Sequence, residues 1–162
     1  MGVSPRNAIF AGSAWLIARA GAMKRHWRFP ERWIQRWRDR LAITPQRLAT
    51  KPCFAAADEG GEVLAFAAWC NRAGEFWNDH LWVLPTRKGR GIGGRRFERC
   101  EQEVRNAGVT SLRIEADPNA EPFYARMGAH NVGRAPVPID RVARFLPVME
   151  KALKRRVETR TV

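Results

Sequence analysis

The residues best suited to chemistry form a glycine-rich, basic segment between an apolar stretch and a predicted helix. The segment runs from Lys88 to Gly94 and reads Lys-Gly-Arg-Gly-Ile-Gly-Gly. Glycine lets the backbone approach a bound group closely, and the unpaired N–H groups of a first helical turn, reinforced by the helix dipole, attract negative charge. The segment therefore predicts a cradle for an anion such as a phosphate or pyrophosphate.

Two nucleotide-binding loops and an ordinary surface turn are the alternatives for this segment. A Walker loop requires a Gly-Lys-Ser/Thr ending, which the segment lacks. Gly89, Gly91 and Gly94 match the Gly-x-Gly-x-x-Gly of dinucleotide-binding domains, where an acidic residue ends a second parallel strand about 20 residues later. Glu115 lies near that distance but inside a predicted strand, so we disfavour a dinucleotide site.

A second segment with chemical potential runs from Asn119 to Gly128 and reads Asn-Ala-Glu-Pro-Phe-Tyr-Ala-Arg-Met-Gly. It contains Tyr124, the only tyrosine of the chain. A phenol has an ordinary pKa near ~10, so it can give a proton to a thiolate of similar basicity. The alternative is that Tyr124 is a core aromatic residue beside Phe123.

Together and in this order, the two segments are similar to motifs of the GNAT family of N-acetyltransferases, specifically its bacterial small-molecule branch. The resemblance covers residues 79–128. The family's pyrophosphate motif, Gln/Arg-x-x-Gly-x-Gly/Ala, matches residues 88–93, with Lys88 in place of Gln or Arg. Its second signature, an Asn followed by an aromatic pair on a short helix and then a Gly, matches residues 119–128.

The resemblance implies that acetyl-CoA (coenzyme A) is the cofactor. Backbone amides of the glycine-rich segment would hold the pyrophosphate, and backbone groups at a splayed strand end would pair with the pantetheine arm. The implied cofactor-binding residues are Leu81, Val83, Lys88, Gly89, Arg90, Gly91, Ile92, Gly93, Gly94, Asn119 and Tyr124.

The implied reaction is direct transfer of the acetyl group to the primary amine of a small molecule. Tyr124 would act as the general acid that protonates the departing thiolate. Two other functions remain as alternatives: acetylation of a protein or tRNA acceptor, and a nucleic-acid-binding module that keeps the fold without catalysis.

A general base is harder to assign than the acid. Many relatives carry an acidic base at a strand position that is occupied here by Trp77. We rank Asp79 first, because strand alternation places it on the same face as Trp77, and Glu115 second. His80 is third: its ordinary pKa suits the role, but alternation predicts that it faces away from Asp79. The alternative is that Asp79 and His80 are structural.

The seven tryptophans raise the question of an aromatic acceptor pocket. Three of them lie in a predicted helical hairpin, which in this family usually covers the acceptor site, and we expect them mainly to pack the helices. Trp27, Trp77 and His80 are our candidates for contact with the acceptor. The tryptophans are residues 15, 27, 33, 37, 69, 77 and 82.

These residues require a mixed α/β domain to position them. Apolar periodicity and breaker residues predict helices over 12–27, 30–41, 44–49, 91–107 and 117–128, and strands over 53–57, 63–70, 76–84, 111–116, 130–137 and 145–153. The resemblance implies that the strands form a mostly antiparallel, splayed central sheet flanked by helices. The family's first strand would fall at 7–10, within a degenerate segment 1–10.

The length of 162 residues fits one domain, which we place at 1–153, followed by a basic tail at 154–162. The net charge of +13 favours polyanionic partners, but the arginines are scattered, so nucleic acid is not the preferred partner. Three widely spaced cysteines suit a reducing cytoplasm and indicate neither a disulfide framework nor a metal site.

The N-terminal segment superficially resembles a secretion signal, but Arg19 would occupy its cleavage site. No apolar run reaches the roughly 18 residues of a membrane span. We therefore expect a cytoplasmic enzyme that does not associate with membranes. A homodimer is compatible with this expectation.

Overall fold

The computed structural model describes residues 13–41, 46 and 52–153. The helices of this part are α2 (Ser13–His26), α3 (Glu31–Leu41), α5 (Ile92–Asn106) and α6 (Glu121–Arg126), with a 3-10 turn η2 at Pro85–Arg87. The strands are β1 (Cys53–Ala57), β2 (Val63–Arg72), β3 (Glu75–Val83), β4 (Ser111–Glu115), β5 (His130–Pro136) and β6 (Phe145–Ala152). The expected strand 7–10 lies outside the described residues, and of the expected helix 44–49 only Gln46 is described, in helical conformation.

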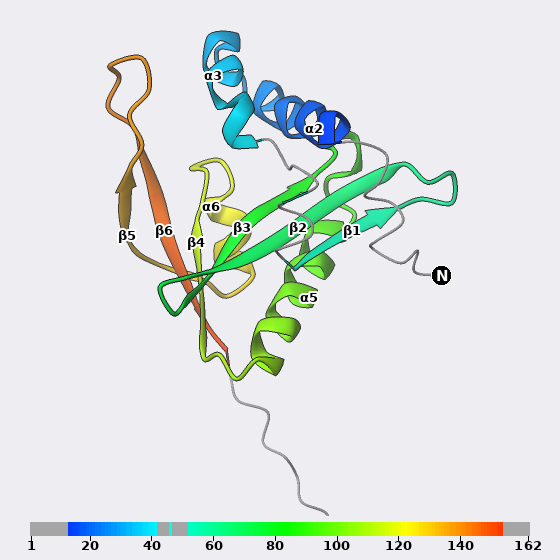
Figure 1. Cartoon of the computed structure of the whole chain (residues 1–162), viewed down its shortest axis with the longest axis vertical. Helices are drawn as coiled ribbons and strands as arrows, with labels where there is room; N and C mark the ends of the chain where they lie inside the picture. Colours follow the sequence, from blue (N-terminus) through cyan, green and yellow to red (C-terminus); the bar gives the residue numbers. More distant parts are fainter. Residues whose placement is uncertain (1–12, 42–45, 47–51, 154–162) are drawn as a thin grey trace, which may run out of the picture.

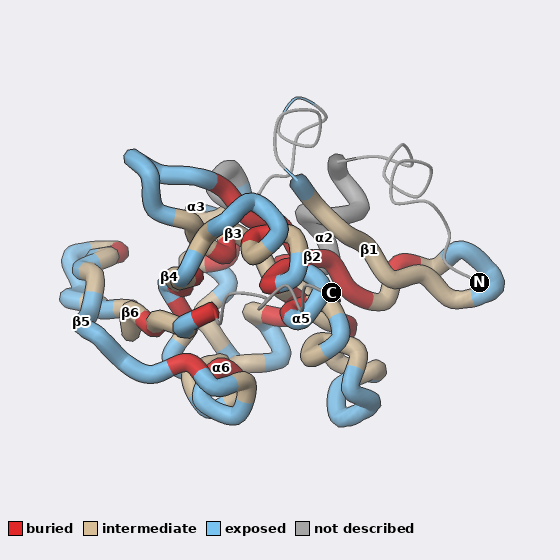
Figure 2. Tube along the Cα trace, turned by 90° about the horizontal axis from the view of Figure 1, so that it is seen from below, coloured by how far each residue is buried: buried red, intermediate tan, exposed pale blue. Residues whose placement is uncertain are grey.

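The six strands form one sheet in the order β1-β2-β3-β4-β6-β5 (Figure 1). Every neighbouring pair is antiparallel except β3 and β4, which are parallel. This arrangement confirms the predicted mixed α/β fold with a mostly antiparallel sheet. Most of β2 is buried, whereas the edge strand β5 is exposed along most of its length (Figure 2).

Helices cover both faces of the sheet. On α5, Phe97, Cys100 and Val104 repeat at helical spacing and are fully buried against one face. On the other face, Met23 of α2 packs with Phe66 and Trp82. No helix among the described residues is long and apolar enough to cross a membrane.

The strands β3 and β4 pair over only two positions, Trp77 with Arg113 and Asn78 with Ile114. Beyond Asn78 they part, although β3 continues to Val83, and they diverge toward the end of the sheet that carries α2 (Figure 1). The predicted splay is therefore confirmed, and its apex is at Asn78.

A β-bulge interrupts β3 immediately after this apex. Ala68 of β2 pairs with His80 and Trp69 pairs with Asn78, so Asp79 is the extra residue of the bulge. A bulge breaks the alternation of side chains. Our expectation that His80 faces away from Asp79 is consequently wrong: the His80 Nε2 and Asp79 Oδ2 atoms lie 3.6 Å apart.

Candidate active site

A pocket of about 520 Å³ opens where β3 leaves β4. It is bounded by the end of β3, the glycine-rich loop, the first turn of α5, and α6. Its lining residues are Met23, Trp27, Leu81, Trp82, Val83, Arg87, Lys88, Gly89, Gly91, Ile92, Gly93, Gly94, Asn119, Ala120, Pro122, Phe123, Tyr124, Arg126 and Met127. The two sequence segments that were singled out for chemistry therefore meet in one cavity.

The glycine-rich loop has the backbone of an anion cradle. Gly89 and Gly91 have φ angles of 77° and 71°, in the left-handed region that favours glycine. Gly91 is the N-cap of α5, and no side chain among the described residues caps it. The N–H groups of Ile92 to Gly94 consequently have no partner within the helix and are available to an anion.

Gly93 is required for close packing around this cradle. A Cβ atom at this position would lie 3.2 Å from Val83 Cγ2 and 3.4 Å from Phe123 Cε2. Any side chain here would therefore push the first turn of α5 away from β3 and α6. The residues present fit the cofactor, because the uncapped first turn of α5 lines the same pocket of about 520 Å³ as Lys88 and Tyr124.

Cationic side chains surround the loop. Arg87 and Lys88 line the pocket, and the Lys88 Nζ atom lies 5.6 Å from the centre of the Trp27 ring. Arg90 is exposed and does not belong to the described lining; its carbonyl oxygen accepts a 3.3 Å hydrogen bond from Arg95 Nη2. The field at the mouth of the pocket is thus positive, which suits a polyphosphate.

Tyr124 closes the inner end of the pocket. Its side chain packs against Phe97 and Phe123, and its hydroxyl donates a 3.1 Å hydrogen bond to Asn78 Oδ1. Burial, together with nearby negative groups that include Asp117, raises the pKa of Tyr124 well above its ordinary range. The phenol therefore keeps its proton at neutral pH, as a general acid requires.

Asn119 lines the pocket and is held by Asp117. Its Nδ2 atom donates a 2.9 Å hydrogen bond to Asp117 Oδ1, and its backbone N–H donates to the same oxygen. The other carboxylate oxygen of Asp117 accepts from Lys24 Nζ at 2.7 Å and from Arg144 Nη2 at 3.1 Å. Asp117 thus ties the pocket wall to α2 and to the segment before β6.

Buried charges dominate the electrostatics of this junction. Burial by itself would raise the pKa of Asp117, but the Lys24 ammonium and the hydrogen bonds from Lys24 and Asn119 outweigh it and hold that pKa below its ordinary value. Burial lowers the pKa of Lys24, and Asp117 offsets this only in part. The Lys24 Nζ atom also lies 5.1–5.4 Å from the ring centres of Trp27, Phe29 and Trp37.

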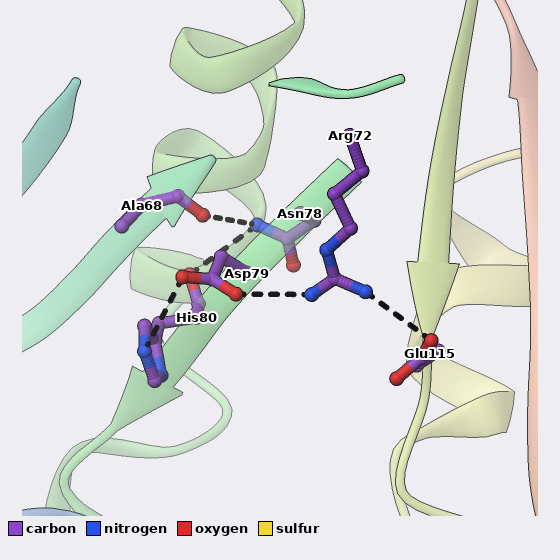
Figure 3. Close-up of polar contacts among 6 residues, drawn as sticks. All are labelled: Ala68, Arg72, Asn78, Asp79, His80 and Glu115. Atoms are coloured by element: carbon purple, nitrogen blue, oxygen red, sulfur yellow. Dashed lines mark hydrogen bonds and ion pairs between the residues drawn. The ribbon is translucent and has the colours of Figure 1, made fainter. Parts of the chain in front are cut away.

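Two of the three candidate bases, Asp79 and Glu115, contact Arg72, and the third, His80, contacts Asp79 (Figure 3). Arg72 Nη2 lies 3.1 Å from Asp79 Oδ1, and Arg72 Nη1 lies 3.2 Å from Glu115 Oε1. The Arg72 guanidinium also lies 5.1 Å from the centre of the Trp77 ring. None of these residues is among those described as lining the pocket. Trp69 and Ala68, which pair with Asn78 and His80, belong to the cores on opposite faces of the sheet, so His80 and the neighbouring Asp79 lie on the face away from Tyr124.

The tryptophans of the helical hairpin divide between two roles. Trp27 lines the pocket, whereas Trp33 and Trp37 form an aromatic cluster with Phe29, with ring centres 5.2–6.3 Å apart. Trp69 and Trp82 are buried in the two cores, and the side chain of Trp15 lies outside the described residues.

Sequence reasoning missed three residues that organise the site. Arg72, Asn78 and Asp117 each make their contacts with partners far along the chain. The only signal for Asp117 was its place at the start of a predicted helix, where an acidic side chain normally acts as a cap. Asn78 stands beside other polar residues in β3, Asp79 and His80, so no signal in the sequence set it apart.

Comparison with known proteins gives the same class as the fold and the pocket. The profile described as the acetyltransferase (GNAT) family matches residues 19–129, more than half of the chain. The chain therefore belongs to the GNAT family of acetyltransferases. Members of this family generally use acetyl-CoA as a co-substrate and act as acyl-CoA-dependent N-acyltransferases. No curated protein sequence matches the chain significantly.

Solved structures share the fold at low sequence identity. A GCN5-related N-acetyltransferase from Rhodopseudomonas palustris is 23% identical, with a TM-score of 0.72 and 94% of each chain covered. An N-acetyltransferase from Staphylococcus aureus is 22% identical, with a TM-score of 0.57 over 72% of this chain and 76% of the other. A ribosomal-protein alanine N-acetyltransferase from Escherichia coli is 18% identical, with a TM-score of 0.57 over 75% of this chain and 84% of the other.

Proposed function

We propose that this protein transfers an acetyl group from acetyl-CoA directly to the primary amine of a small molecule. One observation carries the proposal: the glycine cradle and the Tyr124 side chain line the same pocket. The amides of residues 92–94 would bind the pyrophosphate, assisted by Arg87 and Lys88. Backbone groups of Leu81 and Val83, which no longer pair with β4, would bind the pantetheine arm.

Acetyl-CoA supplies a thioester, whose C–S bond breaks as the acceptor nitrogen forms a bond to the acetyl carbon. Tyr124 gives its proton to the sulfur, so that coenzyme A leaves as a thiol. The proton that the acceptor nitrogen loses goes to a base on the protein, and the tyrosinate is reprotonated from solvent.

Acid and base would act from the two faces of β3. Asn78, bonded to Tyr124, and Asp79, bonded to Arg72, are consecutive residues whose side chains have different partners on different sides of the strand. The acceptor nitrogen would approach from the side of Asp79, where His80 and Glu115 also lie. We propose Asp79 as the base, with His80 and Glu115 as the other candidates.

Two of the three cysteines are poorly suited to carry an acetyl group, which supports direct transfer without a covalent acetyl-cysteine. Burial, with the nearby carboxylates of Glu101 and Glu103, raises the pKa of the Cys100 thiol to about 12. Burial also raises the pKa of the Cys53 thiol. A thiol must ionise to attack a thioester, so neither residue is suited to be a nucleophile.

A macromolecular acceptor is the second candidate. The net charge of +13 would attract RNA or an acidic protein surface, and one structural neighbour is a ribosomal-protein alanine N-acetyltransferase. A nucleic-acid-binding module without catalysis is a separate alternative. RNA binding that weakens steeply with salt, together with thermal unfolding that does not respond to acetyl-CoA, would favour that module over an enzyme.

The test of the proposed function is a screen for coenzyme A release. The protein is incubated with acetyl-CoA and a panel of amines, polyamines, aminoglycosides and amino acids, and free thiol is measured. We expect thiol release that depends on one class of amine, with the acetylated amine detected by mass spectrometry. Release that depends only on added protein or tRNA would replace the small-molecule acceptor by the second candidate.

A further inference from the structure

Asn78 lies where the pairing of β3 with β4 ends. It is the last residue of β3 that pairs with β4, and the next residue, Asp79, is the bulge. Its side chain is almost completely buried, with 7% of the residue exposed. A buried amide costs free energy unless its polar atoms have partners, so its contacts are informative.

The surroundings of the Asn78 side chain determine the orientation of its amide group. The Nδ2 atom donates to the carbonyl oxygen of Ala68 at 3.2 Å and to that of His80 at 3.3 Å. Both acceptors flank the bulge, where regular pairing is interrupted. Because carbonyl oxygens can only accept, the nitrogen must face them and Oδ1 must face Tyr124.

This orientation fixes the direction of the Tyr124 proton. The Oδ1 atom can only accept, so the phenol must donate its proton to it across 3.1 Å. One side chain thus connects the bulged strand to the hydroxyl of α6. The oxygen of Tyr124 is held at the apex of the split, where the pantetheine arm would end.

We propose that Asn78 is a positioning residue that locks the Tyr124 hydroxyl at the point where β3 and β4 part. It acts through Tyr124 and through the bulge, and it does not need to touch the acceptor. The inference rests on the proposed function, because it takes Tyr124 to be the acid that serves the departing sulfur. It adds a residue that determines the position of the Tyr124 hydroxyl and that accepts its hydrogen bond before the reaction.

The test exploits the fact that Tyr124 is the only tyrosine. Protein labelled with ¹³C at tyrosine Cζ gives a single resonance that reports the bonding of the phenol oxygen. We compare the wild type, Asn78→Ala, Asn78→Ser and the control Asn71→Ala, with and without coenzyme A. Asn71 lies in the same strand pair, and its Oδ1 accepts from the Gly74 N–H, away from the pocket.

In the wild type we expect coenzyme A to move the resonance. In Asn78→Ala we expect the resonance of the free protein to be displaced and its response to coenzyme A to be lost or broadened. Turnover should fall about tenfold to a hundredfold, as expected for loss of one buried hydrogen bond to a reacting group, with the KM for acetyl-CoA nearly unchanged. Asn71→Ala should behave as the wild type in both measurements.

The outcomes separate the inference from the proposed function. If the wild-type resonance ignores coenzyme A, Tyr124 does not serve the sulfur and the proposed function fails with the inference. If the wild type responds and Asn78→Ala responds equally, with unchanged kcat, the inference alone is overturned. If the alanine variant unfolds, as judged by its thermal transition, Asn78→Ser takes its place, because the serine hydroxyl can still donate to a carbonyl oxygen at the bulge. A lost response to coenzyme A then supports the inference, and an unchanged response with unchanged kcat overturns it.

Discussion

The Tyr124 hydroxyl and the Asn78 amide oxygen lie 3.1 Å apart and join α6 to β3 at the last position where β3 pairs with β4. The hydrogen bond therefore ties the candidate acid to the feature of the sheet that opens the cofactor pocket. Four predictions test this arrangement and the site around it.

Removal of the Tyr124 hydroxyl should separate chemistry from cofactor binding. Tyr124→Phe retains the ring that packs on Phe97 and Phe123, so the dissociation constant of acetyl-CoA should stay nearly unchanged in calorimetry. Turnover should fall by about 10² or more, because general acid catalysis contributes on that order. Asn78 Oδ1 also loses its donor, which should lower the free energy of unfolding by roughly 1–3 kcal/mol. Unchanged turnover would remove Tyr124 as the acid.

A side chain at Gly93 should close the cofactor site. In Gly93→Val the new atoms would meet Val83 and Phe123, since even a Cβ would lie 3.2 Å from Val83 Cγ2. We expect the rise in melting temperature that saturating acetyl-CoA gives the wild type to disappear. Gly133→Val is the matched control, because a Cβ at that exposed position of β5 meets no described atom within 4 Å. A full thermal shift in Gly93→Val would contradict the cradle.

The buried ion cluster predicts a specific pH dependence of stability. Because the pKa of Asp117 is lower in the folded protein than its ordinary value of 3.8, the carboxylate stabilises the fold above that value. This contribution is lost as the pH falls through the folded-state pKa. Asp117→Asn should therefore cost on the order of 3 kcal/mol at neutral pH, since Lys24 and Arg144 lose a buried partner, and the difference from the wild type should shrink in acid.

The measurement is urea unfolding at a series of pH values. Glu103→Gln removes an ordinary i, i+4 ion pair with Arg99 on the surface of α5 and serves as the control. We expect little change in the free energy of unfolding for this control at any pH. A difference between the wild type and Asp117→Asn that is the same at pH 7 and in acid would show that the charge of Asp117 is unimportant.

The elements and the glycine-rich loop were predictable because they follow local rules. The apolar period of α5, the glycines at 89 and 91 and the breakers between strands are all encoded within short windows of sequence. The direction of the side chains after Asn78 was not predictable, because the bulge at Asp79 depends on pairing with β2. A shift of one residue in register leaves no mark in the pattern of β3 itself.

The contacts that organise the site were hidden for a related reason. Lys24 and Asp117 are 93 residues apart in the chain, and Arg72 meets Glu115 across 43 residues. Such pairs depend on the packing of α2 against the sheet and on the distance between β3 and β4 at the split. Periodicity and motif spacing carry information about neither quantity, so the motifs located the pocket but not the charges that frame it.

The last prediction distinguishes the candidate bases. Asp79 and Glu115 share the Arg72 guanidinium, at 3.1 and 3.2 Å, so loss of either carboxylate leaves Arg72 with one carboxylate partner and perturbs the cluster similarly. Only the true base should also lose proton transfer, which contributes about 10²–10⁴ in rate. We expect Asp79→Asn to lower kcat by at least 10² while Glu115→Gln changes it less than tenfold, in steady-state assays across pH at saturating acetyl-CoA. Each variant is then assayed at high pH, where the acceptor amine is already neutral. Recovery of rate by Asp79→Asn alone supports Asp79 as the base. A larger loss of rate in Glu115→Gln or in His80→Gln transfers the role to that residue.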